Sequence, residues 1–146
     1  MNDRVLEIER LIPAPPERVF DYWTEPELLA QWFGPEGFDI PTKNLDVRPG
    51  GKWRTTMRTP AGELRTVSGV YNLIDRPRRL VFTWGWDDES GGRGPATEVT
   101  VTLEPTPGGT RLKLVQQEFQ TTEARNLHNR GWASSFNKLQ RVVVTG

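Results

Sequence analysis

The 146-residue sequence contains no cysteine and a single histidine, His128. Without cysteine the chain has no disulfide, no thiol nucleophile and no thiolate metal site. A lone histidine is a poor metal ligand, and no second ligand stands four residues further along. No glycine-rich motif opens a helix in the manner of a phosphate-binding loop. We therefore expect neither a metal ion nor a cofactor.

The sequence also lacks an excess of either charge, because nineteen basic and nineteen acidic residues cancel. A surface that binds nucleic acid usually shows as a basic excess, so we expect no nucleic-acid partner. No apolar run approaches the ~20 residues of a membrane-spanning helix. The first ten residues alternate charged and apolar side chains, unlike a secretory signal peptide. These absences predict a cytoplasmic protein without a membrane span, folded as a single domain over residues 1–146.

Apolar residues make up only 35% of the chain, but six Trp, six Phe and two Tyr enlarge the area that a core can bury. Much of the sequence consists of short segments with an apolar residue at every second position, separated by turns rich in Gly and Pro. In the clearest of them Trp53, Thr55 and Met57 alternate with polar residues. This period of two predicts strands with one buried face. The expected strands include residues 6–12, 52–58, 63–74, 80–86, 97–103 and 110–119.

Helical patterns occur near both ends of the chain. Two short helices are expected at Pro16–Trp23 and Pro26–Phe33, where prolines stand at helix starts. Thr24 and Glu27 have the spacing of a capping box for the second. A long helix is expected at Thr121–Val143. One sector of it collects these residues: Ala124, His128, Gly131, Trp132, Ser135, Leu139, Val142 and Val143.

These elements predict an α+β domain. Strands joined by short turns are antiparallel neighbours. A curved antiparallel sheet of about six to seven strands can bury its apolar face by wrapping around the long C-terminal helix. We therefore expect the helix to lie in the concave side of the sheet, with the two short helices following the first strand.

Several motifs in this order resemble the START-like (helix-grip, SRPBCC) superfamily. Within it they are similar to the family of homologues of the activator of the heat-shock protein 90 ATPase. The motifs cover nearly the whole chain: Ala14–Phe20, Pro26–Leu28, Trp32–Pro35, Asp46–Arg54, Gly69–Tyr71, Pro77 with Arg79–Trp84, His128, and Gly131 with Trp132.

The resemblance implies a helix-grip fold, but it does not fix a function, because the same fold hosts carriers, receptors and cyclases. Many relatives look as if they carry a histidine on the strand before the last helix, where this chain has Val115, Gln116 and Gln117. Chemistry that needs an imidazole at that place would be absent. The resemblance also covers only the helix-grip domain. Regulation of a chaperone is therefore a less favoured expectation.

A helix-grip fold with many aromatic residues favours binding of a hydrophobic or amphipathic small molecule between helix and sheet. We expect a cavity of a few hundred Å³, with Trp53, Met57, Trp84, Trp132 and Phe136 in its wall. Trp23 and Phe20 are expected to be core filler. The full set of candidate ligand-binding residues is Trp32, Trp53, Met57, Tyr71, Trp84, Gln116, Glu118, His128, Trp132, Ser135 and Phe136.

Two titratable residues have alternative interpretations. His128 is either a polar contact for a ligand or a structural histidine bonded to a carbonyl or carboxylate on the sheet. Glu118 shares a predicted inward face with Gln116, so it is either paired, with Arg10 as the first candidate, or in contact with water at the mouth of a cavity. The functional alternative is that Glu118 acts as a general base.

A cyclase or dehydratase would use His128, Glu118 and Tyr71, but these are few acid–base groups, so binding is favoured and no catalytic residue is assigned. The main expected partner is a small hydrophobic ligand. A chaperone partner is not favoured. Leu28, Leu29 and Phe33 are the residues that could still provide an apolar patch for a chaperone or for a second copy of the chain.

Overall fold

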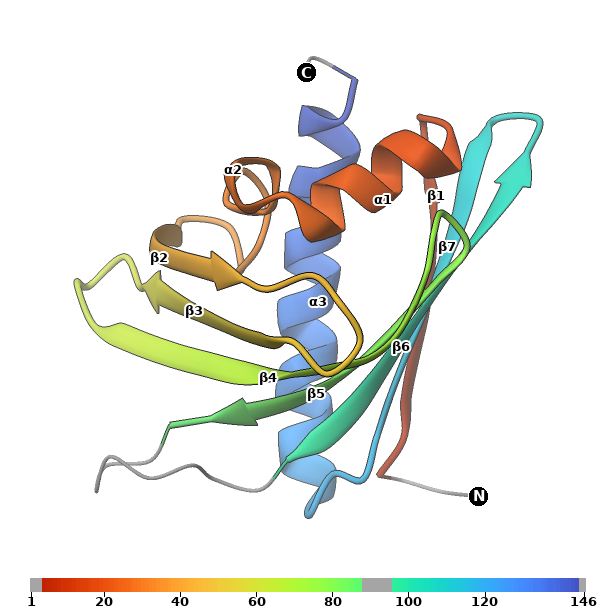
Figure 1. Ribbon diagram of the computed structural model, residues 1–146. Helices are drawn as coiled ribbons and strands as arrows, with labels where there is room; N and C mark the ends of the chain where they lie inside the picture. The colour runs from red at the N-terminus through yellow and green to blue at the C-terminus, as the bar shows by residue number, and fades with distance from the viewer. Residues whose placement is uncertain (1–3, 88–95, 145–146) are drawn as a thin grey trace.

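A computed structural model describes residues 4–87 and 96–144 (Figure 1). Seven strands and three helices follow one another in the order β1 (Leu6–Ile12), α1 (Pro16–Thr24), α2 (Pro26–Leu29), β2 (Asp39–Leu45), β3 (Lys52–Arg58), β4 (Leu64–Asp75), β5 (Arg79–Trp86), β6 (Thr97–Thr106), β7 (Gly109–Gln117) and α3 (Thr122–Val142).

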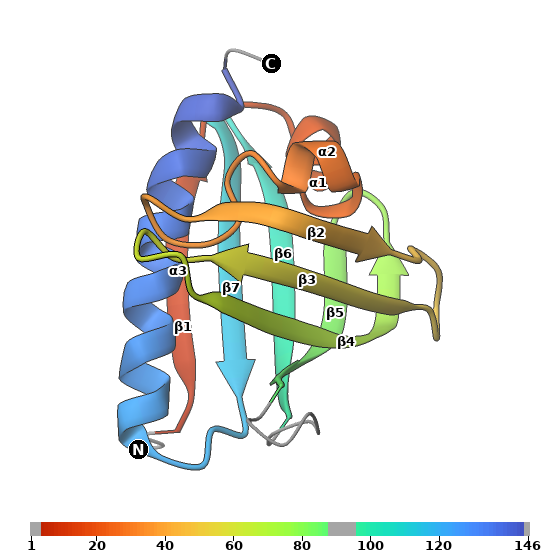
Figure 2. The ribbon, with the colours of Figure 1, turned by 90° about the vertical axis from the view of Figure 1, so that its left-hand side faces the viewer.

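The strands form one antiparallel sheet in the order β1-β7-β6-β5-β4-β3-β2. From β2 to β7 each strand pairs with the next along the chain, while α1 and α2 carry the chain from one edge strand to the other. The sheet curves so strongly that β2, β3 and β4 cross the direction of β1, β7 and β6 (Figure 2). Helix α3 lies in the concave side of this curve (Figure 1).

Strand β3 shows how the sequence produces a two-faced sheet. Trp53, Thr55 and Met57 are buried, whereas Lys52, Arg54 and Arg58 are exposed. Successive side chains of a strand point to opposite faces, so the period of two in the sequence becomes one apolar face and one wet face. The apolar face of β3 is turned toward α3 and the short helices.

Helix α3 begins at a well-formed cap and buries one stripe of its surface. The Thr121 hydroxyl accepts a hydrogen bond from the Ala124 amide at 3.0 Å, which satisfies one of the free N–H groups of the first turn. The buried positions are Trp132, Ser135, Phe136, Leu139 and Val143. Their spacing of three and four residues keeps them on one face of the helix.

Helix α2 departs from expectation in two details, because it ends before the expected Phe33 and its cap is not the expected one. Helix α2 is a single turn that ends at Leu29, and its N-cap residue is Glu25, without a side-chain cap. The predicted capping box is therefore wrong. The Thr24 hydroxyl instead donates to the Phe20 carbonyl at 2.9 Å within α1, a local bond that competes with capping for serine and threonine side chains.

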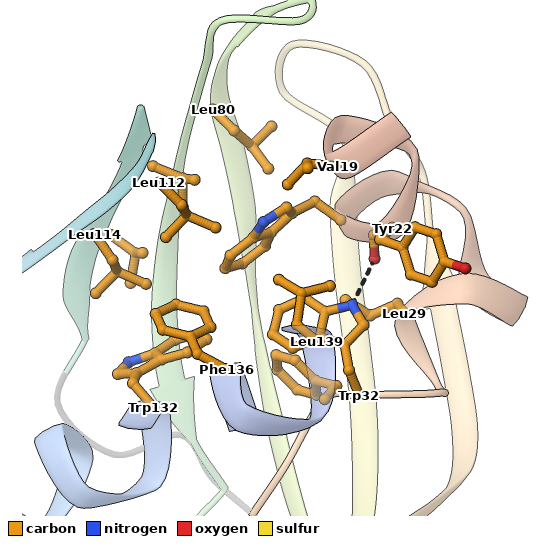
Figure 3. Packing of buried hydrophobic residues seen from close by; sticks show 14 of the residues in the cluster. Val19, Tyr22, Leu29, Trp32, Leu80, Leu112, Leu114, Trp132, Phe136 and Leu139 are labelled. Carbon is orange, nitrogen blue, oxygen red and sulfur yellow. Dashed lines mark hydrogen bonds between the residues drawn. The ribbon is translucent and has the colours of Figure 1, made fainter. Parts of the chain in front are cut away.

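Helices α1 and α2 cover the end of the interior that lies near the C-terminus of α3 (Figure 1). The Arg18 side chain donates to the Val143 carbonyl at 2.7 Å, and the Tyr22 hydroxyl donates to the Val142 carbonyl at 3.3 Å. In the core, Trp132 and Phe136 of α3 lie beside Leu112 and Leu114 of β7 (Figure 3). The predicted α+β helix-grip architecture is thus confirmed, with seven strands in the described part of the chain.

Candidate functional site

Aromatic side chains fill most of the space between α3 and the sheet. The rings of Trp84 and Trp132 have centroids 5.1 Å apart, and Trp132 and Phe136 have centroids 5.6 Å apart. The ring centroids of Trp53 and Trp84 are 5.6 Å apart. All of these residues, together with Met57, are at most 5% exposed. The expected cavity of a few hundred Å³ between these five side chains is therefore wrong, because the rings pack on one another instead of standing apart.

A smaller pocket lies beside this aromatic cluster, under α1 and α2. The space inside it is about 20 Å³, which is enough for roughly one water molecule. Its wall is almost entirely apolar and consists of Trp23, Leu29, Phe33, Leu45, Trp53, Tyr71, Leu80 and Phe82. The pocket thus joins α1, α2 and the segment after it to strands β2, β3, β4 and β5.

The side chain of Leu45 marks where this pocket opens to solvent. The other seven wall residues are at most 5% exposed, while Leu45 is half-buried. Leu45 is the last residue of the edge strand β2 and stands opposite Trp53 of β3. An edge strand has only one neighbour to hold it, so this side of the pocket is also the least constrained.

Gly69 fixes the position of Trp53 in the wall. The Trp53 indole N–H donates to the Thr83 carbonyl of β5 at 3.2 Å, which requires the side chain to lie across β4. A Cβ atom at position 69 would come within 1.8 Å of the Thr83 oxygen and 2.6 Å of the Trp53 nitrogen. Only glycine therefore leaves room for this crossing.

Trp23 differs from the other five tryptophans in its hydrogen bonding. The indole N–H groups of Trp32, Trp53, Trp84, Trp86 and Trp132 all donate to protein acceptors. The Trp23 indole nitrogen is buried and has no hydrogen-bond partner among the described residues. A buried donor without a partner costs about 1–3 kcal/mol. Trp23 therefore carries a buried donor that the described residues leave unused.

Tyr71 contributes a second polar group to the wall. Its side chain is 3% exposed. Burial, and secondarily the nearby Asp46 carboxylate, raise the pKa of Tyr71 far above its usual range. The phenol thus keeps its proton and remains a hydrogen-bond donor.

His128 lies near the other end of α3 and is held by two indoles. Its Nε2 accepts from Trp86 Nε1 at 3.0 Å and from Trp84 Nε1 at 3.3 Å. Its Nδ1 lies 2.7 Å from the Ala124 carbonyl, an acceptor, so Nδ1 must carry the proton. Burial lowers the pKa of His128, although the Ala124 carbonyl opposes this shift. His128 is therefore a neutral residue with both ring nitrogens engaged.

Gln116 is the polar centre of the same end. It is fully buried; its carbonyl oxygen accepts from the Trp132 indole at 2.8 Å and its amide nitrogen donates to the Thr97 hydroxyl at 2.8 Å. The Ser135 hydroxyl donates to the Gly131 carbonyl of its own helix at 2.9 Å. Both side chains are thus used in packing α3 against the sheet, and neither lines the pocket.

The predicted inward position of Glu118 and its pairing with Arg10 are wrong. Strand β7 ends at Gln117, and Glu118 takes a left-handed backbone conformation with φ of 74° and an exposed side chain. Phe119 is buried in its place. Nor does Arg10 serve as its partner, because Arg10 donates to the Asn137 side chain at 2.9 Å. Glu118 lies instead at an open depression formed with Arg4, Val5, Gln117, Phe119 and Gln120.

Of the eleven candidate residues, the pocket brings together only Trp53 and Tyr71. Trp32, Met57, Trp84, Gln116, Trp132, Ser135 and Phe136 are buried elsewhere in the core. Trp23, expected to be filler, belongs to the pocket wall, as do five residues that the candidate set omits: Leu29, Phe33, Leu45, Leu80 and Phe82.

The pocket wall includes part of the segment that was expected to form an exposed patch. Leu29 and Phe33 are only 4% and 3% exposed. Leu29 and Phe33 therefore contribute little to any surface patch. The one signal in the sequence that these residues share a site is their proximity, on one short helix and the turn after it.

The described residues contain no cluster of three or more side chains suited to hold a metal ion. They also include no helix that is long and apolar enough to cross a membrane. The three groups considered for acid–base chemistry lie in three places: His128 among the indoles of β5, Tyr71 in the pocket wall and Glu118 at the surface.

Comparison with known proteins places this geometry in a family. The family model described as "Activator of Hsp90 ATPase homolog 1-like protein" matches residues 13–144. The crystal structure of an AHSA1 protein from Silicibacter pomeroyi is similar, with a TM-score of 0.89 and 34% identity over 97% of this chain and 98% of that chain.

Two further crystal structures are similar at 28% identity. A protein from Chromobacterium violaceum has a TM-score of 0.89 over 97% of this chain and 98% of that chain. A protein from Nitrosomonas europaea has a TM-score of 0.84 over 99% and 97% of the two chains. A search of curated proteins gives no match. The chain therefore belongs to the Activator of Hsp90 ATPase homolog 1-like family, within the START-like superfamily of helix-grip proteins.

Proposed function

We propose that this protein binds a small apolar molecule in the pocket under α1 and α2. The observation that carries the proposal is the wall itself: side chains from two helices and four strands meet there around an unfilled space whose only half-exposed member is Leu45. Ligand pockets are typically apolar concavities with a few polar groups and one opening. The helix-grip fold of the family provides the same arrangement in general.

The pocket must widen to admit a ligand, since about 20 Å³ holds no organic molecule. The segment from α2 to residue 37 contributes to the pocket wall, and polar contacts attach it to helix α3. Glu36 forms two hydrogen bonds with Arg141, both of 2.8 Å, and its amide donates to the Ser134 hydroxyl at 2.8 Å. Lys138 donates to the Pro35 carbonyl at 3.2 Å. Water can replace such contacts near the surface at little cost in free energy. We therefore expect this segment to move when the pocket widens.

The test uses ethylbenzene, a one-ring hydrocarbon, as the probe. We expect saturable binding, observed as shifts of the Trp23 and Trp53 indole N–H signals in ¹⁵N-resolved NMR spectra. The Trp86 signal should stay in place, because Trp86 is outside the pocket wall. Absence of saturable binding up to the solubility limit would refute the proposal.

A matched pair of variants locates the site. Leu45→Trp places a large ring at the opening and should weaken ethylbenzene at least about 10-fold, a loss of roughly 1.4 kcal/mol. Leu73→Trp makes the same change on β4 at a side chain that is 39% exposed and outside the wall. It should leave the affinity within about twofold. Equal effects of the two substitutions would place binding elsewhere.

Two other functions receive less support from the structure. Regulation of a chaperone needs an interface with an apolar centre, but the exposed large apolar residues are dispersed over several elements: Leu11, Val47, Leu64, Leu73, Leu127 and Val144. A cyclase or dehydratase needs acid and base close to one substrate, whereas His128 and Glu118 lie outside the pocket that contains Tyr71.

A further inference from the structure

The segment between α2 and β2 connects the short helices to the edge of the sheet, and it runs beside α3 on the way (Figure 2). We call residues 34–37 of this segment the strap. The Glu36 carboxylate accepts two hydrogen bonds of 2.8 Å from the Arg141 guanidinium, and the Glu36 amide donates to the Ser134 hydroxyl at 2.8 Å. A single acidic residue thus fixes the middle of the strap to the C-terminal half of α3.

Three side chains of α3 hold the strap, and we call them the clasp: Ser134, Lys138 and Arg141. Their spacing of four and three residues keeps them on one face of the helix. The Lys138 ammonium donates to the Pro35 carbonyl at 3.2 Å. The clasp thus contributes two positive charges and a hydroxyl, and the strap contributes a carboxylate, an amide and a carbonyl.

The strap has a glycine at each end. Gly34 and Gly37 have φ of 85° and 87°, in the left-handed region that glycine enters without steric cost. A Cβ atom at position 34 would come within 3.4 Å of the Met57 sulfur and 3.7 Å of Ile40 Cδ1, so the strap begins directly over these buried side chains. Phe33 of the pocket wall immediately precedes it. Rotation at the two glycines can therefore lift the strap and carry Phe33 with it.

The clasp is ionic and lies at the surface, whereas the side chains beneath the strap are apolar. The Glu36 and Arg141 side chains are 48% and 60% exposed. The hydrogen bonds from the Arg141 guanidinium lower the pKa of Glu36, so this carboxylate is charged at neutral pH. Dissolved salt screens exposed charges of this kind but leaves apolar contacts in place. Salt should therefore release the strap while the core beneath it stays packed.

We propose that the strap is an electrostatic gate to the pocket, held closed by the clasp and opened more often as ionic strength rises. Release of the strap lets Phe33 move away from the wall, so that a small molecule can pass. The inference rests on the proposed function and adds the regulation of its site. The clasp controls how fast a ligand enters and leaves, and not how tightly it binds.

The first test measures opening of the strap in the protein without a ligand. Exchange of the Glu36 amide proton with water, followed by NMR, reports release from Ser134. Arg141→Met should speed this exchange about 3- to 5-fold, the range expected for loss of an exposed ion pair. Raising NaCl from about 20 mM to about 0.5 M should speed it about 2- to 3-fold in the unmodified protein and hardly at all in Arg141→Met. The Gly50 amide, bonded in another turn, is the internal reference.

Two further variants separate the charge of the clasp from other effects of substitution. Glu36→Gln keeps a hydrogen-bond acceptor but removes the charge, so exchange at position 36 should lose most of its response to salt. Arg54→Met is the matched control, because it breaks an ion pair of the same length, 2.8 Å to Asp87, at an arginine that is 54% exposed. It should leave exchange at position 36 unchanged.

The second test uses ethylbenzene to ask whether the strap controls entry. The Trp53 indole signal gives the association and dissociation rates from NMR exchange spectra. In Arg141→Met both rates should rise about 3- to 5-fold while Kd stays within about twofold, because entry and exit both require the open strap. Arg54→Met should change neither rate.

The outcomes separate this inference from the proposed function. Exchange at position 36 that responds neither to salt nor to Arg141→Met would overturn the gate, even if ethylbenzene binds. A strap that opens as expected, with both ethylbenzene rates unchanged in Arg141→Met, would also overturn it, because ligands would then enter elsewhere. Absence of ethylbenzene binding would refute the proposed function and the gate with it, while the exchange data would still show whether salt releases the strap.

Discussion

The two ends of the interior of this protein are both rich in tryptophan, but they differ in whether the indole N–H groups have hydrogen-bond acceptors. Near the start of α3, the N–H groups of Trp84, Trp86 and Trp132 all meet acceptors on His128 or Gln116. Under α1 and α2, the Trp23 N–H has no acceptor among the described residues. The three indoles at the first end all have acceptors, while the Trp23 indole at the second end has none among the described residues.

The difference teaches which end is structural. A buried network in which every member is bonded fixes one arrangement of helix and sheet. An unfilled apolar space, by contrast, is one that a bound molecule can occupy. Mutations at the two ends should therefore affect different quantities: stability at the bonded end and binding at the open end.

The largest contrast is expected between two Trp→Phe substitutions. Trp132 and Trp23 are 4% and 3% exposed, so both changes remove similar buried volume. Trp132→Phe also leaves the buried oxygen of Gln116 without its donor. We expect it to cost about 3–4 kcal/mol in the free energy of unfolding, measured by urea denaturation, against about 1–2 kcal/mol for Trp23→Phe, which removes an unpaired N–H. Equal costs would mean that the two indoles are equally satisfied.

Substitution of His128 should give an intermediate effect. His128→Leu removes the acceptor of two indoles and the donor to the Ala124 carbonyl, and we expect it to cost about 2–3 kcal/mol. His128→Gln should cost only about 1–2 kcal/mol, because an amide can accept from one indole. Ethylbenzene affinity should stay within about twofold in both variants. A large loss of binding would join the two ends into one site.

The sequence was sufficient to predict the fold because periodicity reports which face of an element is buried. The strand at Lys52–Arg58 has the predicted bounds, and the stripe of α3 contains the predicted Trp132, Ser135 and Leu139. Glu118 was misplaced because the same periodicity was continued through a left-handed residue, which ends β7 and turns Phe119 inward.

The pocket could not be predicted from the sequence in the same way. An inward position does not reveal whether a ring packs tightly or borders a space, since this depends on contacts between distant segments. Trp84 and Trp132 close on each other, whereas Trp23 borders Leu29, Leu45 and the strands beyond. The indole partners of His128 come from β5, more than 40 positions earlier in the sequence. Only the pairing of helix and sheet in space brings them together.

The smallest effect is expected from a change of pH and also arises at the bonded end. Burial places the pKa of His128 in the folded protein below its value of about 6.5 in the unfolded chain. Above pH 6.5 both states are neutral at this residue and its network is intact. Below it the unfolded chain takes up a proton that the folded protein does not, so the free energy of unfolding falls with falling pH. Protonation of Nε2 would place a third donor against two indole N–H groups.

Between pH 7.5 and 5.5 the decrease should reach at most about 1.4 kcal/mol, which corresponds to one pH unit below the unfolded pKa. Urea denaturation at each pH measures it. His128→Gln should remove this part of the pH dependence, because glutamine does not titrate. The range stops at pH 5.5 so that carboxylates such as Glu36, whose pKa the Arg141 guanidinium lowers, contribute little to the slope. If the same slope persists in His128→Gln, another group titrates in this range. That result would contradict a neutral, buried His128 as the cause of the pH dependence.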